Sequence, residues 1–360
     1  VLAVAAVVMA ATVVPYAAAL FFGAPHEVFG GFIWGVDDGN VYLSWIRQAA
    51  EGRLLLANQY TTDPQNPHFF NMFILLSGGI SASAKMSPIL VFWALRVIGG
   101  IFMLGSFYWL VSLLTADRWV RWSALGLVSL GSGLGWVVVL AEEAGIGTGL
   151  RPVDAGVGWQ TQPEAVTFLS ALLNPLFIIS MGLMCLVLGY ALIALETRSR
   201  PAAALSGVLL LVLGNVHSYD IFAVHVALGL WIIFGLFTGR YSLRHTAVTY
   251  AIIFLIALPA PLWSYWAANQ DPSYIVKAMT PTKSAGLLNY LVSYGLPAAL
   301  AGVGLAALLP AALRRPGVGG APAERCNPHS LLLFPAVWIL AHCIALALPV
   351  SFQRKMVEGL

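Results

Sequence analysis

The chain of 360 residues is 59% hydrophobic and only 9% charged, with a formal net charge of +3. A soluble domain carries roughly 25% charged residues, so this composition excludes an ordinary water-soluble protein. Continuously apolar runs of about 18 residues or more recur along the chain, each long enough to cross a membrane as a helix, and they argue against a β-barrel, whose strands alternate. The small charge excess gives no reason to expect a nucleic-acid partner.

The sequence therefore predicts an all-α polytopic membrane protein, a single transmembrane domain over residues 1–360. The first run lacks the basic residues that open a signal peptide and is followed by further spans, so we expect it to be a membrane helix. Because the chain starts without Met and stops after Glu-Gly-Leu, we expect a piece of a longer protein. The expected spans, about nine, are residues 1–22, 87–115, 119–141, 174–196, 201–216, 218–238, 246–267, 286–310 and 331–350.

Basic residues fall in alternate loops of this topology, and they predict its orientation. Loops rich in Lys and Arg stay on the cytoplasmic side, so these loops and the N-terminus are expected in the cytoplasm of a bacterial-type plasma membrane. Most polar motifs lie in the other loops, which predicts a functional site on the extracytoplasmic side. The basic residues of the alternate loops are Arg118, Arg121, Arg198, Arg200, Arg240, Arg244, Arg314, Arg315 and Arg325.

A large extracytoplasmic loop, about residues 23–86, follows the first span and is expected to carry surface helices. Its segment GVDDGNVYLSWIR has apolar residues with a helical period, and Gly52 is expected to end that helix. The apolar segment 71–84 is too short to span a membrane and predicts a re-entrant or interfacial helix. The apolar stripe of the first helix consists of Tyr42, Trp45, Ile46 and Ala49.

Asp37 and Asp38 open this segment and allow three interpretations. An Asp before a helix is a common N-cap, because its carboxylate accepts backbone N–H bonds. In a Gly-containing turn the two carboxylates could converge, which would raise one pKa toward that of a base working near neutrality. With other oxygens the pair could also hold a hard divalent cation.

The arrangement around these residues resembles the GT-C superfamily of integral membrane glycosyltransferases, the class of protein O-mannosyltransferases and aminoarabinose transferases. The similar features are one membrane helix, an outer loop that opens with Asp37-Asp38, a surface helix bearing Tyr42, and spans joined by short basic loops; they cover about residues 1–200 best. The resemblance implies a polyprenyl-phosphate sugar as donor, Asp37 or Asp38 as catalytic base or acceptor-positioning residue, and a divalent cation, Mg or Mn, in some members.

His217 and Asp220 lie where two spans meet on the outer side. Their i, i+3 spacing lets both side chains share one face of a helix. Ionisable residues at the edge of an apolar stretch are candidates for function. His217 could bind the donor phosphate or relay a proton while Asp220 supports it, or the pair could cap one span and lock two helices together.

The tail after the last expected span carries Arg354 and Lys355 on the outer side, against the general charge bias. A phosphate ligand would account for two cations there, with Gln353 as an additional neutral donor. The other interpretation is that both side chains reach the lipid headgroups. Two more ionisable residues have structural interpretations: Glu164 is expected at the start of a helix, and Arg96 lies inside a span and needs a buried partner.

We therefore expect a membrane glycosyltransferase that moves a sugar from a polyprenyl-phosphate lipid to an acceptor outside the cytoplasm. Asp37 or Asp38 would deprotonate the acceptor, and Arg354, Lys355 and His217 would bind the donor phosphate. Two other classes remain open. One is a non-catalytic accessory or scaffold subunit on a transferase-like fold, since a fold does not determine a function. The other is a transporter for a lipid-linked sugar, although its polar groups would be expected at mid-membrane and on both sides.

Overall fold

The computed structural model describes residues 1–23, 26–131, 133–147, 163–270, 272–284, 286–312 and 328–359. It is 76% helix and contains no strand in these ranges, which confirms the predicted all-helical class. The first helices are α1 (Leu2–Phe21), α2 (Val36–Ala50), α3 (Met72–Ala84), α4 (Pro88–Leu114), α5 (Arg118–Leu130), α6 (Gly135–Glu143), α7 (Thr167–Leu173) and α8 (Pro175–Thr197). They are followed by α9 (Arg200–Val216), α10 (Asp220–Phe237), α11 (Leu243–Ala257), α12 (Pro259–Ala268), α13 (Pro272–Met279), α14 (Leu287–Ala312) and α15 (Phe334–Ala347). Short 3₁₀ segments are η1 (Pro163–Ala165), η3 (Pro328–Leu333) and η4 (Gln353–Val357).

Six helices in the described residues are long and apolar enough to cross a membrane, or seven if the bent pair α11–α12 forms one span. The predicted count of about nine is not confirmed. Two of the expected spans are short, because α9 has 17 residues and α15 has 14. At 1.5 Å per residue, a helix of 14 residues reaches only about 21 Å, less than a hydrocarbon core of about 30 Å. The expected span 246–267 is also broken, with an angle of 41° between its two halves.

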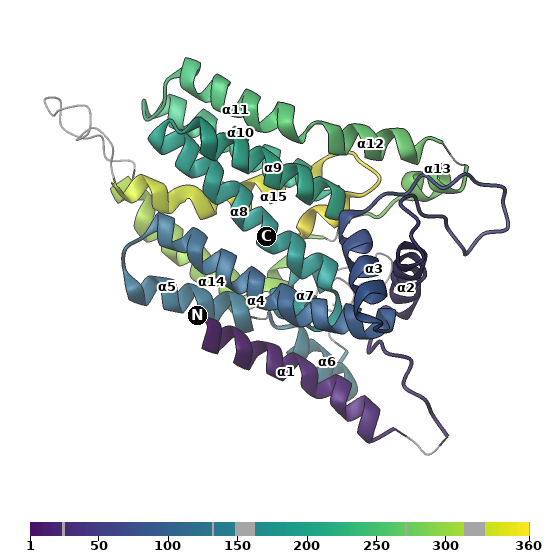
Figure 1. Cartoon of the computed structure of the whole chain (residues 1–360). Helices are drawn as coiled ribbons and strands as arrows, with labels where there is room; N and C mark the ends of the chain where they lie inside the picture. The colour runs from purple at the N-terminus through teal and green to yellow at the C-terminus, as the bar shows by residue number, and fades with distance from the viewer. Residues whose placement is uncertain are drawn as a thin grey trace, which may run out of the picture.

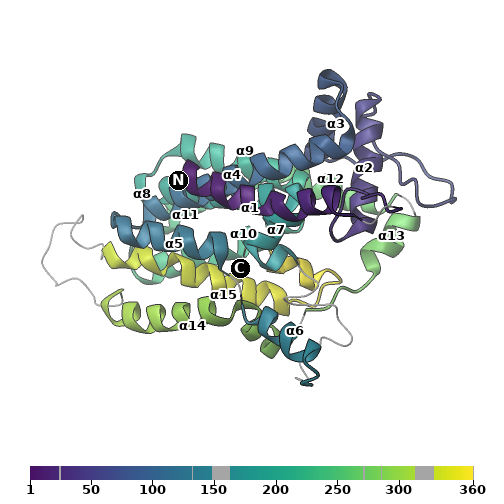
Figure 2. The same ribbon diagram turned by 90° about the horizontal axis from the view of Figure 1, so that it is seen from below.

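The long helices form a bundle whose two ends differ (Figures 1 and 2). The turn between α4 and α5 and the turn between α10 and α11 lie at one end, on the left in Figure 1. At the other end α2 and α3 lie across the bundle, with α13 beside them. The basic α4–α5 and α10–α11 turns and the acidic first loop therefore occupy opposite ends, as the charge pattern predicts, while the basic loop with Arg314, Arg315 and Arg325 lies outside the described residues.

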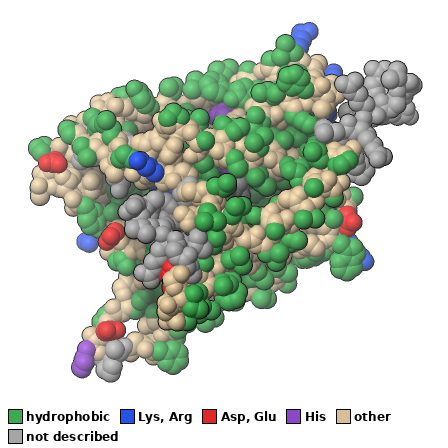
Figure 3. Space-filling view, turned by 180° about the vertical axis from the view of Figure 1, so that it is seen from behind, with side chains coloured by type: hydrophobic (Ala, Val, Ile, Leu, Met, Phe, Trp, Pro, Cys, Tyr) green, Lys and Arg blue, Asp and Glu red, His purple; other side chains and the backbone are tan. Residues whose placement is uncertain are grey.

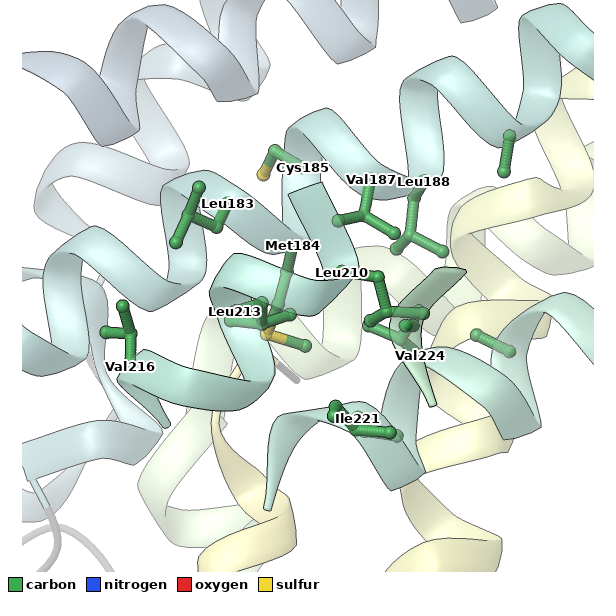
Figure 4. Close-up of a cluster of buried hydrophobic side chains, with 14 of the residues drawn as sticks. Leu183, Met184, Cys185, Val187, Leu188, Leu210, Leu213, Val216, Ile221 and Val224 are labelled. Carbon is green, nitrogen blue, oxygen red and sulfur yellow. The ribbon is translucent and has the colours of Figure 1, made fainter. Parts of the chain in front are cut away.

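Helix α8 forms the centre of the bundle, packed against α4, α9 and α10. Most of its side chains are buried, and Met184, Val187 and Leu188 are fully enclosed. Figure 4 shows these residues pointing toward Leu210 of α9 and Val224 of α10. Small polar groups inside this core are paired locally, since Ser206 Oγ donates to the carbonyl of Val187 at 2.9 Å.

The outer surface of the bundle is apolar, as expected for contact with lipid tails. In Figure 3 hydrophobic side chains cover the middle of the face shown, whereas charged side chains are sparse and lie toward the ends. Helix α14 is the clearest example, because only 6% of its most apolar window is buried. In water such an apolar surface would promote aggregation, and contact with a membrane accounts for it.

The predicted helix of the first loop, α2, is confirmed together with its end. Gly35 precedes it in the left-handed conformation, with φ 66°. Gly52 follows it with φ 91°, where it donates to the carbonyl of Ala49 while the next residue donates to that of Gln48. This pair of bonds closes the helix as a Schellman motif, which favours glycine.

Asp37 and Asp38 lie inside the first turn of α2 rather than in a turn before it. Both are exposed, and neither is the N-cap, which is Gly35. Neighbouring residues of a helix point about 100° apart, so the two carboxylates do not converge as the sequence suggested they could. Their negative charges instead interact favourably with the positive N-terminal end of the helix dipole.

Helix α2 is held in place by close packing on α3. A Cβ atom on Gly78 of α3 would lie 2.4 Å from the Cβ of Ala49 and 2.7 Å from the backbone nitrogen of Ala50. A Cβ on the next residue, Gly79, would meet nothing within 4 Å. Only a glycine at position 78 permits this approach.

The neighbouring glycines Gly78 and Gly79 give a matched test of the packing of α2 on α3. We expect Gly78→Ala to lower stability by about 1–3 kcal/mol, because overpacking forces α2 away from α3. Gly79→Ala is expected to be neutral or to stabilise by up to about 1 kcal/mol, since Ala favours a helix over Gly. Unfolding of the detergent-solubilised protein, followed by tryptophan fluorescence, measures both. Equal stabilities of the two variants would contradict the close packing of α2 on Gly78.

A buried arginine joins α4 to α1 and α7. Arg96 Nη1 donates to Thr12 Oγ1 at 2.9 Å and to the carbonyls of Ala171 and Leu172 at 3.0 and 3.2 Å. Its guanidinium also lies 4.4 Å from the ring centre of Tyr16. The partner that Arg96 needed is thus the carbonyl end of α7, where a cation complements the helix dipole.

Candidate functional site

The turn between α9 and α10 carries the first two residues of the candidate site. Helix α9 ends at Val216, and His217 follows in extended conformation with its N–H bonded to the carbonyl of Leu213 at 2.7 Å. Asp220 then starts α10, where its carboxylate interacts favourably with the positive N-terminal end of the helix dipole. Asn71, the N-cap of α3, donates from Nδ2 to the carbonyl of Val216 at 2.9 Å and fixes the turn.

His217 is held between two carboxylates. Its Nδ1 lies 2.9 Å from Asp220 Oδ1, which realises the pair that the i, i+3 spacing suggested. The same nitrogen lies 3.0 Å from Oε2 of Glu358, a residue of the C-terminal tail. Ser180 of α8 donates from Oγ to the other oxygen of Glu358. His217, Asp220 and Glu358 are 8%, 2% and 1% exposed, so the cluster is built inside the protein.

The electrostatics of this cluster follow from two opposing effects. Burial alone would lower the pKa of His217, but the carboxylates of Asp220 and Glu358 outweigh it and raise that pKa to about 9. The pKa of Glu358 is raised well above its ordinary value, first by burial and then by the charge of Asp220, although His217 and Ser180 oppose the rise.

The tail that carries Glu358 folds back on the bundle through η4, and it brings Arg354 and Lys355 to the same region. Lys355 Nζ lies 3.7 Å from Oε1 of Glu164, which is only 4% exposed. Glu164 lies in the first turn of η1, at the start of a helix as predicted, although it is not the N-cap of α7, which is Val166; its carboxylate also makes this ion pair. Arg354 donates its backbone N–H to the carbonyl of Thr282 at 3.0 Å.

Gln353 holds the tail in this position. Its side-chain nitrogen donates to the carbonyl of Leu348 at 2.7 Å, and its side-chain oxygen accepts from the N–H of Ser284 at 3.4 Å. Both polar atoms of the amide thus contact backbone. The structure gives Gln353 a positioning contact, and its predicted contact with a phosphate stays a prediction.

Tyr42 connects the first loop with this region. The pKa of Tyr42 is raised by burial first, and then by the charges of Asp38, Glu164 and Glu358. The side chain of Asn174, the N-cap of α8, acts on Tyr42 and opposes the rise of its pKa. These groups therefore share one electrostatic environment, which extends from the start of α2 to the tail.

Asp38 and Asp37 differ in their relation to this environment. Asp38 is four residues before Tyr42, so the two side chains share the face of α2 that contacts the bundle. Asp37 is turned about 100° from that face. Of the two adjacent carboxylates, Asp38 is the one aligned with the site.

A divalent cation held jointly by Asp37 and Asp38 does not fit this geometry. The two carboxylates are exposed, diverge from one another and gain no third ligand among the described His, Cys, Asp and Glu residues. A hard cation needs six or more oxygen ligands or several retained waters around converging carboxylates. The start of α2 does not provide such a ligand set.

An apolar cavity of about 190 Å³ lies beside the polar region. Its wall consists of side chains from α4, α5, α8 and α15, among them Phe107, Met181 and Trp338. At one side the lining includes Ala165, next to Glu164, and Gly359, next to Glu358. The chain neighbours of Glu164 and Glu358 thus line this apolar space.

The structure places most of the predicted site residues at one end of the bundle, and it adds others. His217 and Asp220 lie beside the tail that carries Arg354 and Lys355, and Tyr42 is influenced by the charges of both Asp38 and Glu358, whereas Asp37 points elsewhere. Glu358, Glu164 and Asn174 were not predicted as site residues. The available signal was weak: Glu358 is an acid directly after the apolar pair Met356-Val357, a pattern that suits a buried segment.

Comparisons of the chain with protein-family models, with curated proteins and with solved structures find no match.

Proposed function

We propose that this protein is an integral membrane glycosyltransferase of the GT-C type, which moves a sugar from a polyprenyl-phosphate donor to an acceptor hydroxyl outside the cytoplasm. The observation that carries the proposal is the contact between two environments. An ionisable region reaches from Asp38 and Tyr42 to the cationic tail, and an apolar cavity adjoins it at Ala165 and Gly359. A lipid-linked sugar has the same two parts, a charged headgroup and an apolar chain.

The chemistry requires a base on one side of the sugar and cations on the other. Asp38 takes the proton of the acceptor hydroxyl, whose oxygen attacks the anomeric carbon. The bond from that carbon to the phosphate oxygen breaks, and the polyprenyl phosphate leaves with the bonding electrons. Arg354 and Lys355 stabilise the charge on the leaving phosphate, because fixed cations are most effective where charge develops. The apolar cavity accommodates part of the lipid chain.

Binding of the leaving group tests the proposal without knowledge of the sugar. We expect polyprenyl phosphate to bind the detergent-solubilised protein at least about tenfold more tightly than the polyprenol of equal length, since a charge-assisted hydrogen bond contributes about 1.5–3 kcal/mol. Arg354→Gln with Lys355→Gln should remove this preference. Titrations followed by thermal shift measure both.

Arg53→Gln is the matched control, because Arg53 is an exposed cation of the first loop with 54% of its side chain accessible. It should keep the preference for the phosphate. Equal affinities of the wild type for phosphate and alcohol would reject a phosphate-linked donor. They would favour the accessory-subunit alternative, and a stable co-purifying protein complex would then be the supporting result.

A further inference from the structure

We propose that His217, Asp220 and Glu358 form a binding site for a divalent transition-metal ion such as Zn²⁺. This inference does not depend on the proposed transferase function. The three residues come from the α9–α10 turn, the start of α10 and the C-terminal tail, so the fold assembles them from distant parts of the sequence. One ligand atom from each lies within 4.8 Å of the others.

The distances are close to those of a metal-ligand set. Zinc binds imidazole nitrogen at about 2.0–2.1 Å and carboxylate oxygen at about 2.0–2.2 Å, which places tetrahedral ligands about 3.4 Å apart. His217 Nδ1 is 2.9 Å from Asp220 Oδ1 and 3.0 Å from Glu358 Oε2. Outward shifts of a few tenths of an ångström would therefore open the site to an ion.

Two buried oxygen atoms provide an independent indication of a cation site. Asp220 Oδ2 and Glu358 Oε2 are inaccessible to solvent and have no hydrogen-bond partner among the described residues. Glu358 Oε2 has the ion-pair contact with His217 Nδ1, which also bonds Asp220 Oδ1. A buried carboxylate oxygen without a partner destabilises the folded protein. A metal ion bound to both carboxylates would remove that destabilisation.

The ligand types favour a transition metal over Mg²⁺ or Ca²⁺. Imidazole nitrogen suits Zn²⁺ and its neighbours in the first transition row, whereas Mg²⁺ and Ca²⁺ prefer oxygen ligands alone. Ser180 provides the outer contact that such sites use, because it donates to the second oxygen of Glu358 and fixes the carboxylate. Three protein ligands leave one coordination position for water or an anion.

Metal titration of the purified protein in detergent tests the inference directly. After a wash with chelator, we expect the wild type to bind one Zn²⁺ or Co²⁺ per chain, with the Co²⁺ complex visible in its absorption spectrum. Glu358→Gln and His217→Ala should each weaken binding by more than about 100-fold, beyond the effect of a lost outer contact. Equilibrium dialysis with elemental analysis measures the stoichiometry.

His225→Ala is the matched control, because His225 lies on α10 as well but pairs with the Tyr250 hydroxyl at 3.0 Å. It should bind metal like the wild type. Size-exclusion profiles and unfolding without metal show whether each variant folds, and the isosteric Glu358→Gln decides the question if His217→Ala does not. A folded wild type that binds no metal, or full binding by the folded Glu358→Gln protein, would overturn the site. Neither outcome bears on polyprenyl-phosphate binding.

Discussion

Asp38→Asn is expected to lower the rate of sugar transfer by about 10²–10⁴-fold, the usual contribution of a general base. Asn keeps the size of the side chain but cannot take the proton of the acceptor. The prediction follows from the face of α2 on which Asp38 lies, since its charge acts on Tyr42 together with those of Glu164 and Glu358. Release of polyprenyl phosphate from a panel of radiolabelled polyprenyl-phosphate sugars, with a membrane extract as acceptor source, measures the rate.

Asp37→Asn is the matched control for this experiment. Asp37 is the adjacent exposed carboxylate in the same helical turn, but it points about 100° away from the face that carries Asp38 and Tyr42. It should keep transfer within a few-fold of the wild type. A larger loss of transfer rate in Asp37→Asn than in Asp38→Asn would assign the base to Asp37. Full activity of both variants would refute an acid–base role for this pair.

Arg96→Met is expected to destabilise the protein by about 3 kcal/mol or more. The substitution keeps an unbranched side chain but removes the charge that binds the carbonyl end of α7. A hydrogen bond to a charged group contributes about 1.5–3 kcal/mol, and acceptors left buried without a partner cost about 1–3 kcal/mol. Unfolding of the solubilised protein in a graded detergent mixture measures the loss.

Arg96→Lys separates the role of the charge from that of the guanidinium. Lys should restore part of the stability, because it keeps the positive charge but cannot reach several acceptors with one planar group. Thr12→Val removes only one partner, the hydroxyl 2.9 Å from Nη1, and should cost less than Arg96→Met. If Arg96→Met unfolds at the same detergent fraction as the wild type, the arginine does not anchor α7.

Local features of the fold were predictable from the sequence, because short-range chemistry determines them. The helix over Val36–Ala50 follows from its apolar period, and its end follows from Gly52. The contact of His217 with Asp220 follows from a spacing of three residues. The opposite placement of the basic α4–α5 and α10–α11 turns and the first loop follows from alternation of the spans.

Long-range features were not predictable in the same way. The position of Glu358 beside His217 depends on a tail that folds back over the bundle, and no local pattern encodes this return. The convergence of Asp37 and Asp38 was an expectation about a turn, but the helix begins one residue before them and separates their side chains. The predicted count of about nine spans is not confirmed in the described residues, because apolar composition alone does not show where a helix bends or stops, as α11, α12 and α15 do.

The contact between Asn71 and Val216 has a consequence for the construction of chimaeras. One amide side chain begins α3, through its Oδ1, and binds the last carbonyl of α9, through its Nδ2. The first loop is therefore fastened to the turn that presents His217 and Asp220. A first loop exchanged with that of another protein would have to retain an Asn at this position, because without it the turn that carries His217 would lose this contact.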